Sequence, residues 1–93
     1  VYPSMIRDLN FVLDEGIPVG EVIHTINKNG NEILIDVEPI SIFRDNSIGE
    51  NNKAVAINLI FQSAKKTLED KDVNPVIDEI IRVVSKKFSA KLR

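Results

Sequence analysis

The chain has 93 residues, a net charge of −2 and no cysteine, and 43% of its side chains are hydrophobic. This length supports one domain with a single modest core. The lack of cysteine excludes disulfides and thiolate metal sites, and no apolar run is long enough to cross a bilayer. We therefore expect one small globular domain in residues 1–93, and a cytoplasmic location fits this composition.

Charge is distributed unevenly along the chain. Residues 1–52 carry three basic and nine acidic side chains, whereas residues 53–93 carry nine basic and five acidic ones. The cations gather toward the end, at Arg82, Lys86, Lys87, Lys91 and Arg93. A basic flank is common near the C-terminal end of a helix, where the helix dipole favours cations. The charge pattern alone therefore does not indicate a nucleic-acid partner.

The first third of the chain predicts a strand followed by a short helix. Apolar and polar residues alternate from Arg7 to Leu13, which predicts a half-buried strand over about residues 5–13. After Pro18, apolar residues recur at the three-and-four spacing of one helical face, which predicts a helix over 18–29. Gly30 then stands where a left-handed cap would end that helix.

Residues 34–44 predict a second strand. Ile40 and Ile42 alternate with Ser41 and Phe43, so we expect the two isoleucines to face the core. Pro39 cannot donate to a ladder of hydrogen bonds, which indicates an edge strand or a bulge at that point. The polar stretch 45–52 contains a glycine and is typical of a hairpin loop.

The last third predicts a strand, a long helix and a short final strand. Residues 53–61 alternate clearly, and apolar residues then keep helical spacing over 70–88. Thr67 is a candidate cap for this helix. Asn74–Pro75 disturbs the pattern, because a residue before proline avoids helical geometry, so the helix begins either near Asp70 or at Pro75.

The predicted order is β-α-β-β-α-β. This order indicates a ferredoxin-like α+β fold, a two-layer sandwich with a four-stranded antiparallel sheet and both helices on one face. The chain begins with Val1 and its one methionine is Met5. We therefore expect this domain to be an excerpt of a longer protein.

The sequence offers little material for catalysis. His24 is the one histidine and lies opposite the apolar stripe of its helix, so we expect an exposed residue without a chemical role. No phosphate-binding loop or dinucleotide motif is present, and no nucleophile can be paired with a base. We expect no catalytic residue, no metal site and no cofactor in this domain.

The face of the sheet that the helices leave open is more informative. Alternation places six residues there, namely Asn10, Ser41, Phe43, Ala54, Ala56 and Asn58. One aromatic ring among small and hydrogen-bonding neighbours can stack on an RNA base and contact its edge. The same ring can instead pack against a neighbouring domain or subunit, since exposed apolar groups mark interfaces of every kind.

Five segments in order along the chain carry specific motifs, namely Pro3 with Arg7–Val12, Ile17–Val22, Ile48–Lys53, Phe61–Val73 and Ala90–Arg93. Together they resemble the C-terminal ferredoxin-fold anticodon-binding domain of the bacterial phenylalanyl-tRNA synthetase beta subunit. They are similar, in turn, to the family's opening P-x-x-x-R-D motif, its V-P helix entry, its I-G-E-G-K-K loop, its F-x-[SA]…T-L-x-D stretch and its closing G-A-x-L-R. The resemblance covers nearly the whole chain.

The resemblance implies that the open face holds the first anticodon base. In the family, an aspartate and a tyrosine of an F-D-V-Y strand contact that guanine, and a serine on the next strand assists. The matching positions here are Ser41, Phe43 and Ala54, and all three depart from the pattern. We therefore expect RNA binding through Phe43, Ser41, Ala54, Asn10 and Asn58, with weaker selectivity for the base.

The resemblance also implies the rest of the assembly. The full enzyme is expected to be a tetramer of two alpha and two beta chains, in which the alpha subunit aminoacylates phenylalanine tRNA with ATP and magnesium. This domain is expected to position the tRNA without catalysing the reaction, and neither a membrane nor DNA is expected as a partner. Two other classes stay open: a ferredoxin-like regulatory domain that binds a small molecule, and a protein-interaction module without RNA binding.

Overall fold

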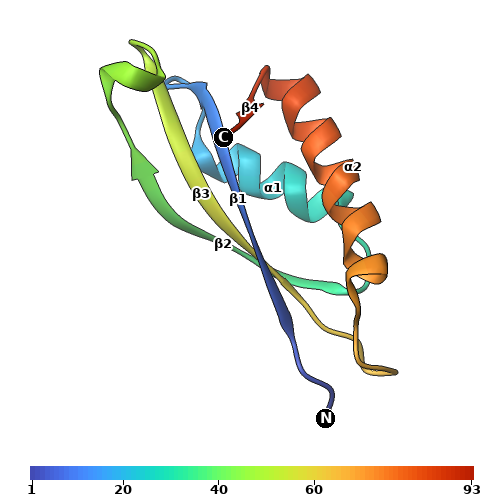
Figure 1. The fold of residues 1–93 in the computed structure, drawn as a ribbon. Helices are drawn as coiled ribbons and strands as arrows, with labels where there is room; N and C mark the ends of the chain where they lie inside the picture. The colour runs from blue at the N-terminus through green and yellow to red at the C-terminus, as the bar shows by residue number, and fades with distance from the viewer.

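The computed structural model describes residues 1–93, in which four strands and two helices follow the predicted order (Figure 1). The elements are β1 (Met5–Asp14), α1 (Val19–Asn29), β2 (Leu34–Phe43), a 3₁₀ turn η1 (Asn46–Ile48), β3 (Asn52–Phe61), α2 (Asp70–Phe88) and β4 (Lys91–Leu92). The bounds of β1, α1, β2, β3 and α2 lie within one residue of those that the sequence predicts, and β4 is the predicted short final strand. The β2–η1–β3 segment is the predicted hairpin.

The sheet is antiparallel throughout, with the strand order β2-β3-β1-β4. Figure 1 shows both helices on one side of the sheet, so the opposite side stays open. This arrangement confirms the ferredoxin-like two-layer fold. Each helix turns one apolar face to the sheet, and neither is long and apolar enough to cross a membrane.

The core lies between the sheet and the helices. β1 contributes Leu9, Phe11 and Leu13 to it, as their alternation predicts, and all three are buried. The other buried members come from α1, β2, β3 and α2, and include Val22, Ile26, Val37, Val55, Ile57, Leu59, Phe61, Val73, Ile80 and Val84. Full burial of one such side chain contributes roughly 1.5–3 kcal/mol, so this cluster is the main source of stability.

The prediction that Ile40 and Ile42 lie in the core is wrong. Their side chains are 54% and 45% exposed. Pro39 lies opposite Ile57 while Ser41 lies opposite the preceding residue Ala56, so Ile40 is the unpaired extra residue of a β-bulge. Ile42 does return to the helix-covered face, but β2 is an edge strand and this end of it curls away from the helices (Figure 1).

The boundaries of the helices also correct the sequence analysis. Gly30 ends α1 with extended backbone, not in the left-handed conformation. A Cβ atom there would lie 2.3 Å from Cδ2 of Leu34, so a larger residue would force the Leu34 side chain to shift.

The long helix begins without the predicted cap and without the alternative break. The residue before its first turn is Glu69 rather than Thr67. Asp72 accepts a hydrogen bond from the Glu69 backbone N–H at 2.8 Å, which stabilises this turn. With its start fixed in this way, α2 continues through Pro75 without a separate turn.

Candidate nucleic-acid interface

The open face of the sheet is built from rows of residues that lie opposite one another on neighbouring strands. Directly opposed residues of an antiparallel pair project to the same face. The first row is Phe43, Ala54, Val12 and Lys91; the second is Ser41, Ala56 and Asn10; the third is Glu38, Asn58 and Asp8. The pairing therefore brings all five predicted site residues to one face.

Phe43 stands at the edge of this face, with the expected exposure. Its side chain is 45% exposed, and Ser41 is exposed beside it. Ala54 is on the same face, yet it is only 2% exposed, so the expectation that it is accessible is wrong. Its methyl group is covered because a small side chain in a central strand lies below its larger neighbours. Ala54 therefore forms the floor of the face.

Asn10 and Asn58 occupy the middle of the open face on the two central strands. Both side chains are half-buried. Their amide oxygens are buried and accept no hydrogen bond from the protein. An unpaired buried acceptor costs free energy, so rotation of either amide toward a donor on a bound molecule would be favourable.

Arg93 is a further member of this face, although alternation in the sequence does not place it there. Its backbone N–H donates to the Asn10 carbonyl oxygen at 2.7 Å, which continues the β1–β4 pairing. Its guanidinium carbon lies 5.1 Å from the centre of the Phe43 ring. β4 and β2 are the two outer strands, so this cation–π contact extends across the open face.

The half of the open face beyond the second row is acidic. Asp36 follows the row of Glu38, Asn58 and Asp8 and lies opposite Ile60. The pKa of Glu38 is raised, because its protonated form donates a hydrogen bond to Asp36 and because the Asp36 carboxylate is a like charge close by. These carboxylates repel phosphate, whereas the other half of the face has Lys91 and Arg93.

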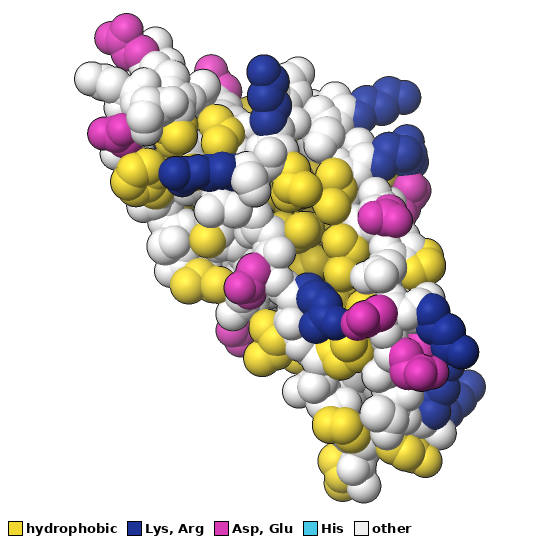
Figure 2. Space-filling view, viewed as in Figure 1, with side chains coloured by type: hydrophobic (Ala, Val, Ile, Leu, Met, Phe, Trp, Pro, Cys, Tyr) yellow, Lys and Arg dark blue, Asp and Glu magenta, His cyan; other side chains and the backbone are white.

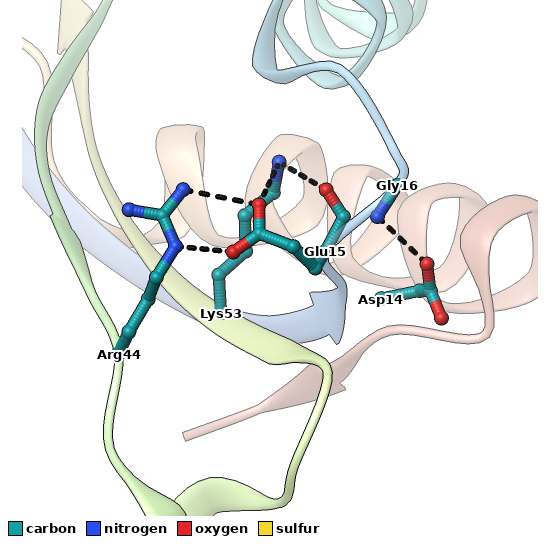
Figure 3. A network of polar contacts seen from close by, with 5 residues as sticks. All are labelled: Asp14, Glu15, Gly16, Arg44 and Lys53. Atoms are coloured by element: carbon teal, nitrogen blue, oxygen red, sulfur yellow. Dashed lines mark hydrogen bonds and ion pairs between the residues drawn. The ribbon is translucent and has the colours of Figure 1, made fainter.

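An ion-pair network fixes the end of the sheet next to Phe43 and Ala54 (Figure 3). Arg44 holds both carboxylate oxygens of Glu15 through Nε and Nη2. Lys53 is only 5% exposed and donates to the Glu15 backbone oxygen at 3.0 Å. The hydrogen bonds from Arg44 lower the pKa of Glu15, so its carboxylate stays charged. Because Arg44 and Lys53 directly adjoin Phe43 and Ala54, the network fixes the row that contains the aromatic ring.

The remaining charged groups lie mostly on the helical layer. In Figure 2, Lys and Arg side chains gather on the side where Figure 1 draws α2. Arg82 on that helix is held by Glu79 at 2.7 Å, and His24 on α1 is exposed, as expected. No three His, Asp or Glu side chains come together in a metal-binding cluster. The polar and aromatic groups of the open sheet face therefore form the candidate site.

Comparison with known proteins assigns the chain to a family. The family described as ferredoxin-fold anticodon binding domain matches residues 1–93. The chain is 34% identical over 92 residues to the phenylalanine–tRNA ligase beta subunit of Pseudoalteromonas translucida, 35% over 91 residues to that of Prochlorococcus marinus, and 36% over 92 residues to that of Vibrio parahaemolyticus. These alignments cover 98–99% of this chain and 11–12% of each relative. The chain therefore belongs to the ferredoxin-fold anticodon binding domain family.

Proposed function

We propose that this chain binds the anticodon loop of phenylalanine tRNA on the open face of its sheet. The observation that carries the proposal is the family match over the whole chain, together with one exposed aromatic ring on that face. Bases of a single-stranded loop are unstacked and can be recognised by aromatic stacking and by hydrogen bonds to their edges. The open face offers both kinds of group.

The predicted site residues stack on a base, leave space for it or form hydrogen bonds with base edges in this proposal. Phe43 stacks on one base, and the small Ala54 and Ala56 beside it leave room above the sheet. The Ser41 hydroxyl and the amides of Asn10 and Asn58 take part in hydrogen bonds with base edges. Stacking accepts any base, whereas edge contacts discriminate.

The selectivity of this domain for the first anticodon base is proposed to be low. Ser41 replaces the longer aspartate of the family pattern, and Phe43 lacks the hydroxyl of the usual tyrosine. Ala54 supplies no hydrogen bond where the pattern has serine. Stacking on Phe43 then provides most of the affinity, and fewer groups discriminate guanine from other bases.

The charges on the face orient the bound loop. Phosphates are repelled from Asp8, Asp36 and Glu38 and attracted toward Lys91 and Arg93 on the opposite half. A base stacked on Phe43 would therefore have its phosphates on the β4 side of the ring. The separation of acidic and basic halves therefore favours one of the two directions in which the RNA loop could cross the sheet.

The domain is proposed to serve as part of a larger enzyme, because the relatives are beta subunits of phenylalanine–tRNA ligase. In this proposal it is a non-catalytic domain of a beta subunit in a cytoplasmic tetramer of two alpha and two beta chains. It positions the tRNA while the alpha subunit carries out aminoacylation with ATP and magnesium. The domain itself is proposed to need no cofactor.

Binding of phenylalanine tRNA to the 93-residue chain tests the proposal. Affinity should be higher for phenylalanine tRNA than for an unrelated tRNA, and it should fall as salt increases because phosphate contacts release counterions. Equal and salt-independent retention of both tRNAs would contradict RNA recognition and would favour a protein-interaction module. The chain alone should also show no phenylalanine-dependent pyrophosphate exchange.

A further inference from the structure

Arg93 and Phe43 come from opposite edges of the sheet, yet their side chains meet above it. Two strands, β3 and β1, separate them, and the guanidinium carbon is 5.1 Å from the ring centre. Ala54 and Ala56 lie in the rows that the contact crosses. Their methyl groups are short enough to let an arginine extend over the strands, which larger side chains at these positions would prevent.

The backbone of Arg93 is held by a hydrogen bond, whereas its guanidinium forms no ion pair. The N–H of Arg93 is bonded to Asn10 at 2.7 Å, and no carboxylate forms an ion pair with its guanidinium. Asp45 is nearby. Its pKa is lowered mainly by hydrogen bonds from Ser47, with a smaller contribution from the charge of Arg93. The contact with Phe43 is thus the principal interaction of this guanidinium.

The observed geometry leaves no room for a base on the covered side of the ring. A base between the two groups would need about 7 Å, two layers of roughly 3.5 Å each. The distance in the structure is 5.1 Å. Arginine must therefore move away from the ring before a base can stack on that side.

We infer that Arg93 is an additional RNA-binding residue that covers Phe43 in the free domain and transfers its guanidinium to a phosphate of the nucleotide that stacks on Phe43. This inference rests on the proposed function. Guanidinium groups pair with phosphate through two parallel hydrogen bonds. The acidic half of the face repels phosphates toward the side on which Arg93 lies. When the Arg93 side chain moves off the ring, it therefore stays close to those phosphates.

Salt-dependent binding of a synthetic stem-loop with the phenylalanine anticodon tests this inference. Each lost phosphate contact on a single strand lowers the slope of log affinity against log salt by about 0.7. Arg93→Gln should show this loss and weaken binding about 5- to 10-fold at low salt, in proportion to one phosphate contact. It should do so equally for all anticodon sequences, because phosphates carry no sequence information.

The matched control is Arg82→Gln, which removes the same charge from the helical layer. It should leave the salt slope unchanged. Arg93→Lys keeps the charge and should retain most of the affinity. A second readout needs no RNA: the side-chain protons of Arg93 should show an upfield ring-current shift in the free chain, and Phe43→Leu should abolish it.

The outcomes separate the two proposals. A wild-type chain that does not bind the stem-loop overturns the proposed function itself. A wild-type chain that binds, with an Arg93→Gln variant of unchanged slope, overturns the role of Arg93 alone. Tighter binding by Arg93→Gln also overturns it, because the arginine would then only obstruct the ring.

Discussion

The ammonium group of Lys53 donates to the backbone oxygen of Glu15 at 3.0 Å and lies 3.6 Å from its carboxylate. This contact joins the first residues of β3 to the turn after β1. Arg44, at the end of β2, holds the same carboxylate. One acidic residue therefore connects three strands where the row of Phe43 and Ala54 begins.

Loss of the Lys53 side chain should destabilise the domain. Lys53→Ala leaves the Glu15 carbonyl oxygen unpaired and opens a cavity, which together cost about 2–4 kcal/mol of unfolding free energy. Lys53→Met keeps most of the packing and should cost about 1–2 kcal/mol. Urea denaturation measures both. Lys65→Ala, an exposed control, should change stability by less than about 0.5 kcal/mol, and a similarly small effect at Lys53 would contradict the role given to it.

The stability of the fold should depend on Glu15 at acidic pH. The pKa of Glu15 is lowered in the folded chain by the hydrogen bonds from Arg44, so the unfolded chain binds its proton first as pH falls. Its contribution is therefore present above the ordinary glutamate pKa and is lost as pH falls through the lowered folded pKa. Glu15→Gln should be less stable than wild type at pH 7, and the two stabilities should converge in acid.

Thermal melting between pH 7 and pH 3 measures this convergence. Glu32→Gln provides the control, because Glu32 is exposed and forms no ion pair in the structure. Its stability curve should run parallel to that of wild type. A constant difference between Glu15→Gln and wild type over the whole range would show that the charge of Glu15 is not what stabilises the network.

Gly20 in α1 and Gly30, which follows its last residue, should respond oppositely to alanine. A Cβ atom at Gly30 would meet Leu34 at 2.3 Å, whereas one at Gly20 would meet nothing within 4 Å. Gly30→Ala should therefore cost about 1–3 kcal/mol through forced repacking. Gly20→Ala should stabilise the helix by about 0.5–1 kcal/mol. Denaturant titration of both variants checks the pair, and equal effects would contradict the packing of Leu34 against Gly30.

The elements of this fold could be predicted because their signals are local. Alternation marks β1 and β3, and helical spacing marks α1 and α2, so these four elements lie within a residue of their predicted bounds. Pro39 correctly indicated an edge strand or a bulge. Alternation cannot reveal the bulge that turns Ile40 out of the core, nor the way the end of the edge strand β2 curls away from the helices and leaves Ile42 exposed.

The parts of the site that escaped prediction depend on contacts between distant residues. Arg93 reaches Phe43 only because the strand order places β4 and β2 at the two edges of the sheet, and because the side chains of Ala54 and Ala56 between them are short. Alternation marks Lys53 only as the first residue of a predicted strand, and its burial follows from the position of Glu15, 38 residues earlier. Neither relationship leaves a periodic signal in the sequence.

Restoring one residue of the family pattern should sharpen base selectivity. Ser41→Asp places a carboxylate beside Phe43, and carboxylates accept hydrogen bonds from the imino and amino groups of guanine. The ratio of affinities for stem-loops with guanine and with adenine at the first anticodon position should rise by about 5- to 150-fold, equivalent to about 1–3 kcal/mol for one edge contact. Ser41→Asn is the uncharged control, and an unchanged ratio in Ser41→Asp would place the base elsewhere.

The affinity of phenylalanine tRNA for Phe43→Ala, measured beside its melting temperature, tests the central claim most directly. Loss of one stacked base should weaken binding by about 1–3 kcal/mol. Stability should change little, because a side chain at this exposed position leaves no cavity. Unchanged tRNA affinity would contradict the assignment of the open face to RNA. So would a collapse in melting temperature that accounts for the loss of binding, since Phe43 would then be a structural residue.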